Sequence, residues 1–215
     1  GENLVKILVA EDVQMNMILI KTLLNSFIPN ADIIEARNGM EAVELYNTEF
    51  PDLIIMDVQM PQMDGLEATR EIRKVELKSG RHTPVIALTA AASEEDEEKC
   101  RNAGMDDFLT KPIEQGKLNE LINHYLGVGS KSTVHDIPDS SIHFNRVEMM
   151  KRVDNNSDML NEMLHALEGE MAGTLDILKD AVSEKRDDLI KYNLHKIKGI
   201  SLNMSFDRLT EIVKS

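Results

Sequence analysis

In the first 127 residues, short runs of apolar residues alternate with longer segments whose apolar residues recur at helical spacing. The runs predict strands at 4–10, 31–36, 51–57, 84–89 and 107–110, and the periodic segments predict helices near 14–28, 39–48, 65–78, 93–103 and 114–126. Five successive strand–helix units of this kind are typical of a doubly wound α/β fold with a parallel sheet. Turn residues at Asn38-Gly39, Asp64-Gly65 and Ala103-Gly104 indicate the ends of helices.

The pattern changes after residues 128–141, a segment of small, polar and turn-forming residues that predicts a linker. Beyond it, apolar residues recur only at helical spacing, which predicts an all-α helical bundle over residues 142–215. A short helix, two long helices and an amphipathic segment that stops at Ser215 leave this bundle without its last helix. Either the native chain continues, or another molecule covers the open apolar face, which we expect to favour association. Because the sequence begins Gly-Glu-Asn-Leu without an initiator Met, we expect the chain to be a piece of a longer protein.

Charge and cysteine content narrow the classes of function. The net charge is −14, and most of the acidity falls within residues 1–127, which argues against nucleic-acid binding because a basic face is its usual footprint. Cys100 is the only cysteine, so no intrachain disulfide forms, and a free thiol fits a reducing compartment. No apolar stretch reaches the length of about 18 residues that a membrane-spanning helix needs. We expect a cytoplasmic segment without membrane contact, whose parent protein is free to be anchored in the inner or plasma membrane.

Chemically reactive side chains follow four of the predicted strands. Asp57 ends the buried run Leu53-Ile54-Ile55-Met56, and the acid pair Glu11-Asp12 ends the first run. In open parallel sheets, the carboxyl ends of the strands form the edge where ligands bind. The carboxylates at this edge predict a site for Mg²⁺ or Mn²⁺, with Asp12 and Asp57 as direct ligands and Glu11 direct or through water. The backbone carbonyl of Gln59 completes the predicted ligand set.

The same edge predicts phosphoryl transfer. Asp57 is the candidate nucleophile, because carboxylates form aspartyl-phosphate intermediates. Lys111 follows the last strand and is expected to pair with a phosphoryl oxygen, while the hydroxyl of Thr89 and the backbone N–H of Ala90 are expected to donate to the others. Each residue alone has a plainer explanation, since acids cap helices and Lys-Pro occurs in turns. Their occurrence together at the ends of four strands favours the functional interpretation.

A second candidate site lies in the helical part, at His195. Lys191, Lys198 and Gly199 are its neighbours at helical spacing, and His195 is offset from the apolar stripe, so its ring is expected to reach solvent. Lysines beside an imidazole favour its neutral, nucleophilic form and attract phosphate. Gly199 costs the helix about 1 kcal/mol relative to alanine, which close approach of a partner would explain.

Residues 4–127 resemble the receiver domain of response regulators, which has the flavodoxin-like form of the doubly wound fold. The resemblance rests on Glu11-Asp12, on Asp57 in Met-Asp-Val-Gln-Met-Pro-Gln-Met-Asp-Gly, on Thr89 in Ala-Leu-Thr-Ala, and on Lys111-Pro112. It implies that Asp57 accepts a phosphoryl group from a phosphohistidine and that the domain slowly hydrolyses its own acyl phosphate. It also implies a switch in which Thr89 moves inward and Phe108 follows. The sequence around Asp57 and Lys111 is most similar to that of receivers in hybrid sensor histidine kinases.

The segment His-Lys-Ile-Lys-Gly resembles the phosphohistidine motif of histidine phosphotransfer domains. The resemblance implies that His195 is phosphorylated, that Lys198 binds the phosphate, and that Gly199 is the small residue where a partner approaches. The two resemblances together imply a relay from the histidine of an upstream kinase core to Asp57, then to His195, then to the receiver of a separate response regulator. The implied domains are 1–127 and 142–215, joined by the linker at 128–141.

Two other classes of function remain open at this point. A magnesium-dependent phosphohydrolase that works through an aspartyl phosphate needs an acid two residues after its nucleophile, and Gln59 occupies that place. A pure interaction module would use the same fold without phosphorylation, although the complete set of acids argues against it. No glycine-rich nucleotide-binding signature occurs, so we expect no ATP-dependent kinase activity from this chain itself.

Overall fold

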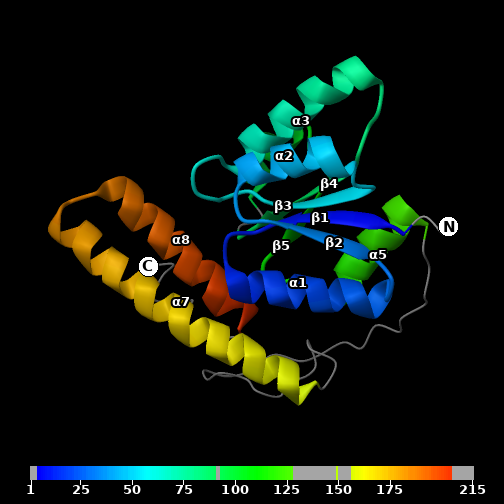
Figure 1. Ribbon diagram of the computed structural model, residues 1–215. Coiled ribbons are helices and arrows are strands. Elements are labelled where there is room, and N and C mark those ends of the chain that lie inside the picture. Colours follow the sequence, from blue (N-terminus) through cyan, green and yellow to red (C-terminus); the bar gives the residue numbers. More distant parts are fainter. Residues whose placement is uncertain (1–3, 91–92, 128–148, 150–155, 205–215) are drawn as a thin grey trace. The chain divides into compact units, whose positions relative to one another are not determined.

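Five short strands pair in parallel to form one sheet (Figure 1). They are β1 (Lys6–Ala10), β2 (Asp32–Ala36), β3 (Leu53–Asp57), β4 (Val85–Thr89) and β5 (Asp107–Thr110). Their order in space is β2-β1-β3-β4-β5, the flavodoxin-like arrangement that the sequence predicted. The computed structural model describes residues 4–90, 93–127, 149 and 156–204, and these fall into two compact units, of which the sheet forms the first.

Helices follow each strand of the sheet unit: α1 (Gln14–Phe27), α2 (Gly39–Glu49), α3 (Gly65–Ser79), α4 (Glu94–Ala103) and α5 (Gln115–Leu126). Figure 1 shows α2 and α3 on one face of the sheet and α1 and α5 on the other. Because both faces are covered, β3 and β4 are buried along their whole length. This is why the sequence of β3 is a continuous apolar run rather than an alternating one.

The turn residues that predicted helix ends act as helix caps. The Oδ1 atom of Asn38 accepts a hydrogen bond from the N–H of Glu41 at 2.8 Å, and that of Asp64 accepts one from Glu67 at 2.7 Å. Gly104 ends α4 with a φ of 94°, a left-handed conformation that favours glycine. The predicted helix boundaries are confirmed closely, whereas β1 and β3 begin later than the apolar runs suggested.

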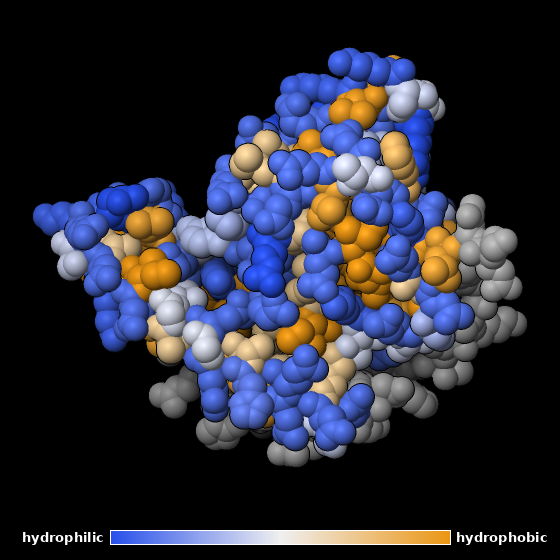
Figure 2. All heavy atoms as spheres, in the orientation of Figure 1, coloured by the Kyte–Doolittle hydropathy of each residue, from blue (hydrophilic) through white to orange (hydrophobic). Residues whose placement is uncertain are grey.

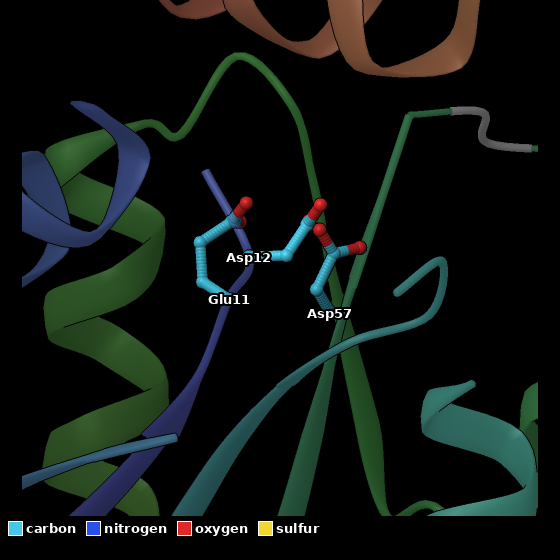
Figure 3. Close-up of side chains that lie close together, drawn as sticks. All are labelled: Glu11, Asp12 and Asp57. Atoms are coloured by element: carbon cyan, nitrogen blue, oxygen red, sulfur yellow. The ribbon is translucent and has the colours of Figure 1, made fainter. Parts of the chain in front are cut away.

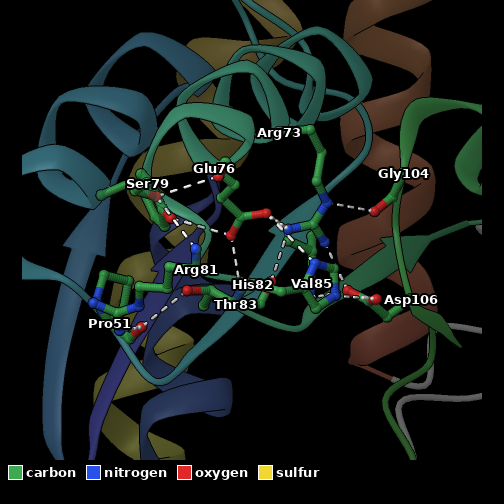
Figure 4. A network of polar contacts seen from close by, with 11 residues as sticks. Pro51, Arg73, Glu76, Ser79, Arg81, His82, Thr83, Val85, Gly104 and Asp106 are labelled. Carbon is green, nitrogen blue, oxygen red and sulfur yellow. Dashed lines mark hydrogen bonds and ion pairs between the residues drawn. The ribbon is translucent and has the colours of Figure 1, made fainter.

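A network of polar contacts lies at the amino-terminal ends of β4 and β5 (Figure 4). Arg73 of α3 is at its centre: its guanidinium contacts Glu76 at 2.5 Å and Asp106 at 2.7 Å. The buried carboxylate of Glu76 also accepts the N–H of Thr83 at 2.7 Å, and Asp106 accepts a bond from His82 at 2.7 Å. The network therefore ties α3 to the segments that lead into both strands, and nothing in the sequence pattern predicted it.

The second unit contains two long helices, α7 (Ser157–Ser183) and α8 (Asp187–Asn203), which pack against each other (Figure 1). The predicted apolar stripes are only partly covered within the described residues, because Leu175 is 42% exposed, Val182 58% and Leu194 37%. The predicted linker at 128–141, the short helix before α7 and the amphipathic segment after α8 lie outside the described residues.

Hydrophilic residues cover most of the face shown in Figure 2, with smaller areas of hydrophobic residues between them. Apolar side chains fill the core of the sheet unit, where Ile7, Leu8, Ile54 and Ile86 are completely buried. Among the described residues, no helix is both long enough and apolar enough to cross a lipid bilayer.

Candidate phosphoacceptor and divalent-cation site

Three carboxylates meet at the carboxyl ends of β1 and β3, as Figure 3 shows. Asp57 is the last residue of β3, and Glu11 and Asp12 come directly after β1. The two strands are neighbours, with Ala10 paired to Met56, so their ends bring the three side chains together. One oxygen of each carboxylate lies within 4.8 Å of the others. Glu11 and Asp57 are buried and Asp12 is half-buried.

Lys111 supplies the cation of the site. It follows β5, and its side chain is almost completely buried. Its Nζ donates to Oε2 of Glu11 at 2.9 Å and to Oδ2 of Asp57 at 2.7 Å. The backbone N–H of Lys111 donates to the carbonyl oxygen of Thr89 at 2.7 Å. The ammonium group therefore bridges the ends of β1 and β3, while its backbone is fixed to the end of β4.

The site holds more negative than positive charge in a region with little water. Burial raises the pKa of the Asp57 carboxyl; the ammonium of Lys111 opposes this shift, and the charge of Asp12 adds to it. For Lys111, burial lowers the pKa, but attraction to Asp57 and Glu11 outweighs burial and raises the pKa above its ordinary value. Lys111 is therefore an ammonium ion, hydrogen-bonded to two of the three carboxyl groups.

This donor set fits a hard divalent cation. Carboxylate oxygens are the ligands that Mg²⁺ and Mn²⁺ prefer, and a divalent cation would offset the repulsion among three neighbouring carboxylates. Glu11, Asp12 and Asp57 are close enough to share one ion. Gln59 lies two residues past Asp57, and its N–H donates to Oδ1 of Asp57 at 3.1 Å. Two neighbouring strand ends thus bring the three predicted carboxylates together, whereas the Gln59 carbonyl stays a predicted ligand.

The remaining predicted residues of the sheet lie on β4 and β5. Thr89 is the last residue of β4 and is buried, and Ala90 follows it, half-buried. Phe108 lies on β5 and is half-buried, with the Nζ of Lys117 5.2 Å from the centre of its ring. Pairing of Thr89 with Thr110 puts the ends of β4 and β5 side by side, on the side of β3 away from β1.

Sequence reasoning treated Gly65 only as a turn residue, but it also shapes the site. A Cβ atom at position 65 would lie 2.1 Å from the backbone oxygen of Asp57, and the N–H of Gly65 donates to the carbonyl oxygen of Val58 at 2.9 Å. The start of α3 thus packs against the backbone of Asp57, the residue predicted to be the nucleophile. The Asp-Gly pair was the available signal, but its spacing from Asp57 could not reveal the close approach.

The second candidate site lies on α8, in the other unit. His195 and Lys198 are half-buried there, while Lys191 is exposed and Gly199 is buried. Their spacing of three and four residues puts His195, Lys191 and Lys198 on adjacent turns of the helix. The expectation that the His195 ring reaches solvent is compatible with its partial exposure.

Comparison with known proteins identifies the sheet unit. The family model of the response regulator receiver domain matches residues 7–123, which is more than half of the chain. The chain therefore belongs to the response regulator receiver domain family, the signal-receiving module of two-component systems. The match ends before α7 and α8 and assigns no family to those helices.

The relatives include a hybrid histidine kinase and a response regulator, the two kinds of protein that the sequence suggested. Over 123 residues the chain is 46% identical to hybrid signal transduction histidine kinase I of Dictyostelium discoideum, a match that covers 55% of this chain and 7% of that protein. Over 121 residues it is 39% identical to the polar-differentiation response regulator DivK of Brucella ovis, covering 56% of this chain and 95% of the regulator. The chain thus spans only a small part of the first relative and nearly all of the second.

Two solved structures share the fold of the sheet unit. One is the receiver domain of a sensor histidine kinase from Pseudomonas aeruginosa with a magnesium ion coordinated in its active-site cleft; identity is 37%, the TM-score is 0.53, and the match covers 58% of this chain and 99% of that one. The other is a co-crystal of the Saccharomyces cerevisiae histidine phosphotransfer protein Ypd1 with the receiver domain of its downstream regulator Ssk1, at 31% identity and a TM-score of 0.53, covering 57% of this chain and 88% of that one.

Proposed function

We propose that Asp57 accepts a phosphoryl group from the phosphohistidine of a kinase, as the first step of a phosphorelay. The observation that carries the proposal is the buried Asp57 carboxylate, held 2.7 Å from the Nζ of Lys111 beside Glu11 and Asp12, in a chain of the receiver family. In the transfer, an Asp57 oxygen forms a bond to phosphorus while the bond from phosphorus to the donor imidazole nitrogen breaks. That nitrogen keeps the electron pair.

The residues around Asp57 have separate tasks in this proposal. Lys111 is an ammonium ion already bonded to Asp57, so it is positioned to pair with an oxygen of the arriving phosphoryl group. Thr89 and the N–H of Ala90, at the end of β4, are proposed to donate to the other oxygens. Glu11, Asp12, Asp57 and the carbonyl of Gln59 are proposed to hold Mg²⁺ or Mn²⁺, which when bound neutralises charge on the phosphoryl group.

We propose that phosphorylation changes the surface near β4 and β5. A new bond from the Thr89 hydroxyl to the phosphoryl group would draw this side chain toward Asp57 and leave space for the half-buried ring of Phe108. Phe108 has no phenolic hydroxyl, so its contribution to either position is packing alone. Lys117 above the ring would have to follow any movement of Phe108.

For the second unit we propose a histidine phosphotransfer domain over residues 142–215, joined to the receiver at 1–127 by the linker 128–141. His195 would take the phosphoryl group from Asp57 and pass it to the receiver of a separate response regulator. Lys198 would bind the phosphate, and Gly199 would leave room for the partner. Support comes from the two long helices with partly uncovered apolar stripes, and that uncovered face is also a proposed site of self-association.

The proposed parent is a hybrid sensor histidine kinase. The identity of 46% to the Dictyostelium hybrid kinase supports this, although the matching part is a small fraction of that protein. The kinase core of the same parent would then be the upstream donor. We propose that the relay operates in the cytoplasm, whether or not the parent is anchored in a membrane.

The test is phosphoryl uptake by the whole 215-residue chain from acetyl phosphate and Mg²⁺, followed by intact mass. Wild type is expected to gain one or two phosphoryl groups, Asp57→Ala none, and His195→Ala only the group on Asp57. Mild alkali hydrolyses the acyl phosphate and leaves phosphohistidine, which separates the two products. Asp176→Ala and His165→Ala, both at exposed positions of α7, are the matched controls.

The outcomes separate the functions still open. Uptake that needs Asp57 but never reaches His195 would contradict the internal relay and leave a receiver that serves another partner. No uptake, even from a histidine kinase, would favour a phosphorylation-independent interaction module. Rapid release of phosphate would favour the phosphohydrolase, which Gln59 makes unfavourable.

A further inference from the structure

Gly39, the first residue of α2, lies against the loop that connects β3 to α3. Its N–H donates to the carbonyl oxygen of Met63 at 3.0 Å. A Cβ atom at position 39 would lie 2.5 Å from that oxygen and 3.0 Å from the carbonyl oxygen of Asp64. Both are backbone atoms, so rotation of a side chain cannot relieve the clash. A larger residue at this position therefore requires the backbone to move.

The loop that Gly39 contacts begins and ends at the phosphoacceptor. The N–H of Gln59 donates to the Asp57 carboxylate at 3.1 Å, and the N–H of Gly65 donates to the carbonyl oxygen of Val58 at 2.9 Å. Between them, Gln62 has a φ of 67° and the N–H of Met63 donates to the carbonyl oxygen of Pro61 at 2.8 Å. Such a tight three-residue turn has little conformational freedom. A shift at Met63 is therefore passed along the loop toward Gln59 and Asp57.

The helix on the other side of the contact is held more firmly. Asn38 caps α2 by accepting the N–H of Glu41 at 2.8 Å, and the Glu41 carboxylate accepts the N–H of Arg37 at 2.8 Å. Ala42 and Tyr46 bury the next turns of the helix against the core. If a side chain is added at position 39, the loop rather than the helix is expected to give way.

We propose that Gly39 is a positioning residue for the divalent-cation site. Through its contact with Met63 it fixes the loop that carries Gln59, and so it sets where the Gln59 carbonyl and Asp57 meet the ion. The inference rests on the proposed site of Glu11, Asp12 and Asp57, and it adds a residue from a different element, more than fifteen positions before Asp57 in the sequence. Gly39 acts by excluding a side chain and donating one hydrogen bond.

The first experiment is a Mn²⁺ titration of the whole chain, with free Mn²⁺ measured by electron paramagnetic resonance. Gly39→Ala is expected to weaken binding about tenfold, as loss of support around metal ligands commonly does. Gly116→Ala is the matched control, because a Cβ there meets nothing within 4 Å, and its affinity is expected to equal that of wild type.

A pair of variants tests whether the backbone contact is responsible. The added Cβ would also lie 2.8 Å from Cγ of Met63. Met63→Ala removes that side-chain atom and keeps the carbonyl, so alone it is expected to leave Mn²⁺ affinity unchanged. The double variant Gly39→Ala with Met63→Ala is expected to stay as weak as Gly39→Ala. Full recovery in the double variant would contradict the proposal.

Hydrogen exchange of the wild-type chain tests the contact without any substitution. Saturating Mg²⁺ is expected to slow exchange of the Gly39 amide, because a fixed loop holds its acceptor in place. The amide of Ala42, which donates to Asn38 within the same helix at 3.1 Å, is the internal control and is expected to change less. This measurement decides the matter if Gly39→Ala fails to fold.

Different results would contradict the cation site and the role of Gly39. If wild type binds no Mn²⁺, or if Asp12→Asn binds as well as wild type, the proposed cation site is wrong. The cation site stands if wild type binds Mn²⁺ and Asp12→Asn does not. In that case, normal Mn²⁺ binding by Gly39→Ala, together with a Gly39 amide whose exchange rate Mg²⁺ does not change, would overturn only the inference about Gly39.

Discussion

The two ends of the same sheet hold ionic clusters of opposite design. At the carboxyl ends of β1 and β3, the carboxylates of Glu11, Asp12 and Asp57 lie together, and the ammonium group of Lys111 contacts the first and the last of them. At the amino ends of β4 and β5, Arg73 lies between Glu76 and Asp106, with backbone N–H groups of Thr83 and Val85 donating to the same two carboxylates. In the first cluster one lysine contacts two of three neighbouring carboxylates, and in the second one arginine and two backbone N–H groups contact two carboxylates.

We interpret the difference as that between a proposed binding site and a structural cross-link. Burying a carboxylate costs free energy unless donors or cations compensate it. The cluster at the amino ends meets that need with groups of the chain itself, so its contribution is to stability. The cluster at the carboxyl ends gathers three carboxylates beside one lysine, an arrangement that is expected to cost stability and that suits the proposed cation and phosphoryl group. Substitutions at the two ends are therefore expected to change the free energy of unfolding in opposite directions.

The largest effect is expected from Arg73→Ala at the amino ends. It leaves the carboxylate of Glu76 buried and that of Asp106 without its cation, and should lower the free energy of unfolding by about 3 kcal/mol. Urea denaturation measures this. Arg70→Ala, an exposed position on the same helix, is the control and should change stability by less than about 0.5 kcal/mol. Affinity of the folded protein for Mg²⁺ is expected to stay normal; a parallel loss would contradict the separation of roles.

A smaller effect of opposite sign is expected from Asp12→Asn. Removing one of the crowded carboxylates should raise the stability of the metal-free chain by about 1 kcal/mol, while the stabilisation that wild type gains from Mg²⁺ disappears. Urea denaturation with and without Mg²⁺ measures both changes. Glu98→Gln, an exposed acid on α4, should alter neither. If Asp12→Asn destabilised the metal-free chain, the carboxyl-end cluster would be a structural one.

A pH-dependent effect on stability is expected from the titration of Asp57. Its folded-state pKa is raised above the ordinary carboxyl value, so the folded chain binds this proton more tightly than the unfolded chain does. The resulting stability is present below the unfolded pKa and is lost as pH rises through the folded pKa. Thermal melting of metal-free Asp57→Asn and wild type, from about pH 4 to 7, should show the advantage of the variant growing with pH. A constant difference would contradict the raised pKa.

The sequence predicted the sheet unit well because its signals are local. Asn38, Asp64 and Gly104 stop or start helices by contacts within a few residues, and the apolar run that ends at Asp57 reflects burial on both faces. The grouping of Glu11, Asp57 and Lys111 was also predictable, because parallel strands bring their carboxyl ends to one edge. The roles of these residues, and of His195, stay predictions until the phosphoryl-transfer experiment.

The sequence could not predict contacts that join distant positions without a repeating pattern. Arg73 contacts Asp106, 33 positions further along the chain, and Gly39 contacts Met63 although the rest of α2 and all of β3 lie between them in the sequence. Neither pair carries a hydrophobic period or a recognisable spacing. Gly65 was visible as a turn residue, but its approach to the Asp57 backbone depends on how α3 enters the sheet.

By itself, the order of apolar runs and turn residues determined five strand–helix units, their parallel pairing, and which acids end which strands. These follow from periodicity and from the geometry of strand ends, and both depend on residues that are close together in the sequence. Only the tertiary structure decided how far each charge is buried, that Lys111 bridges two of the acids, and that Gly39 supports the loop after Asp57. Burial and charge balance depend on atoms that different elements bring together, so they exist only once the chain has folded.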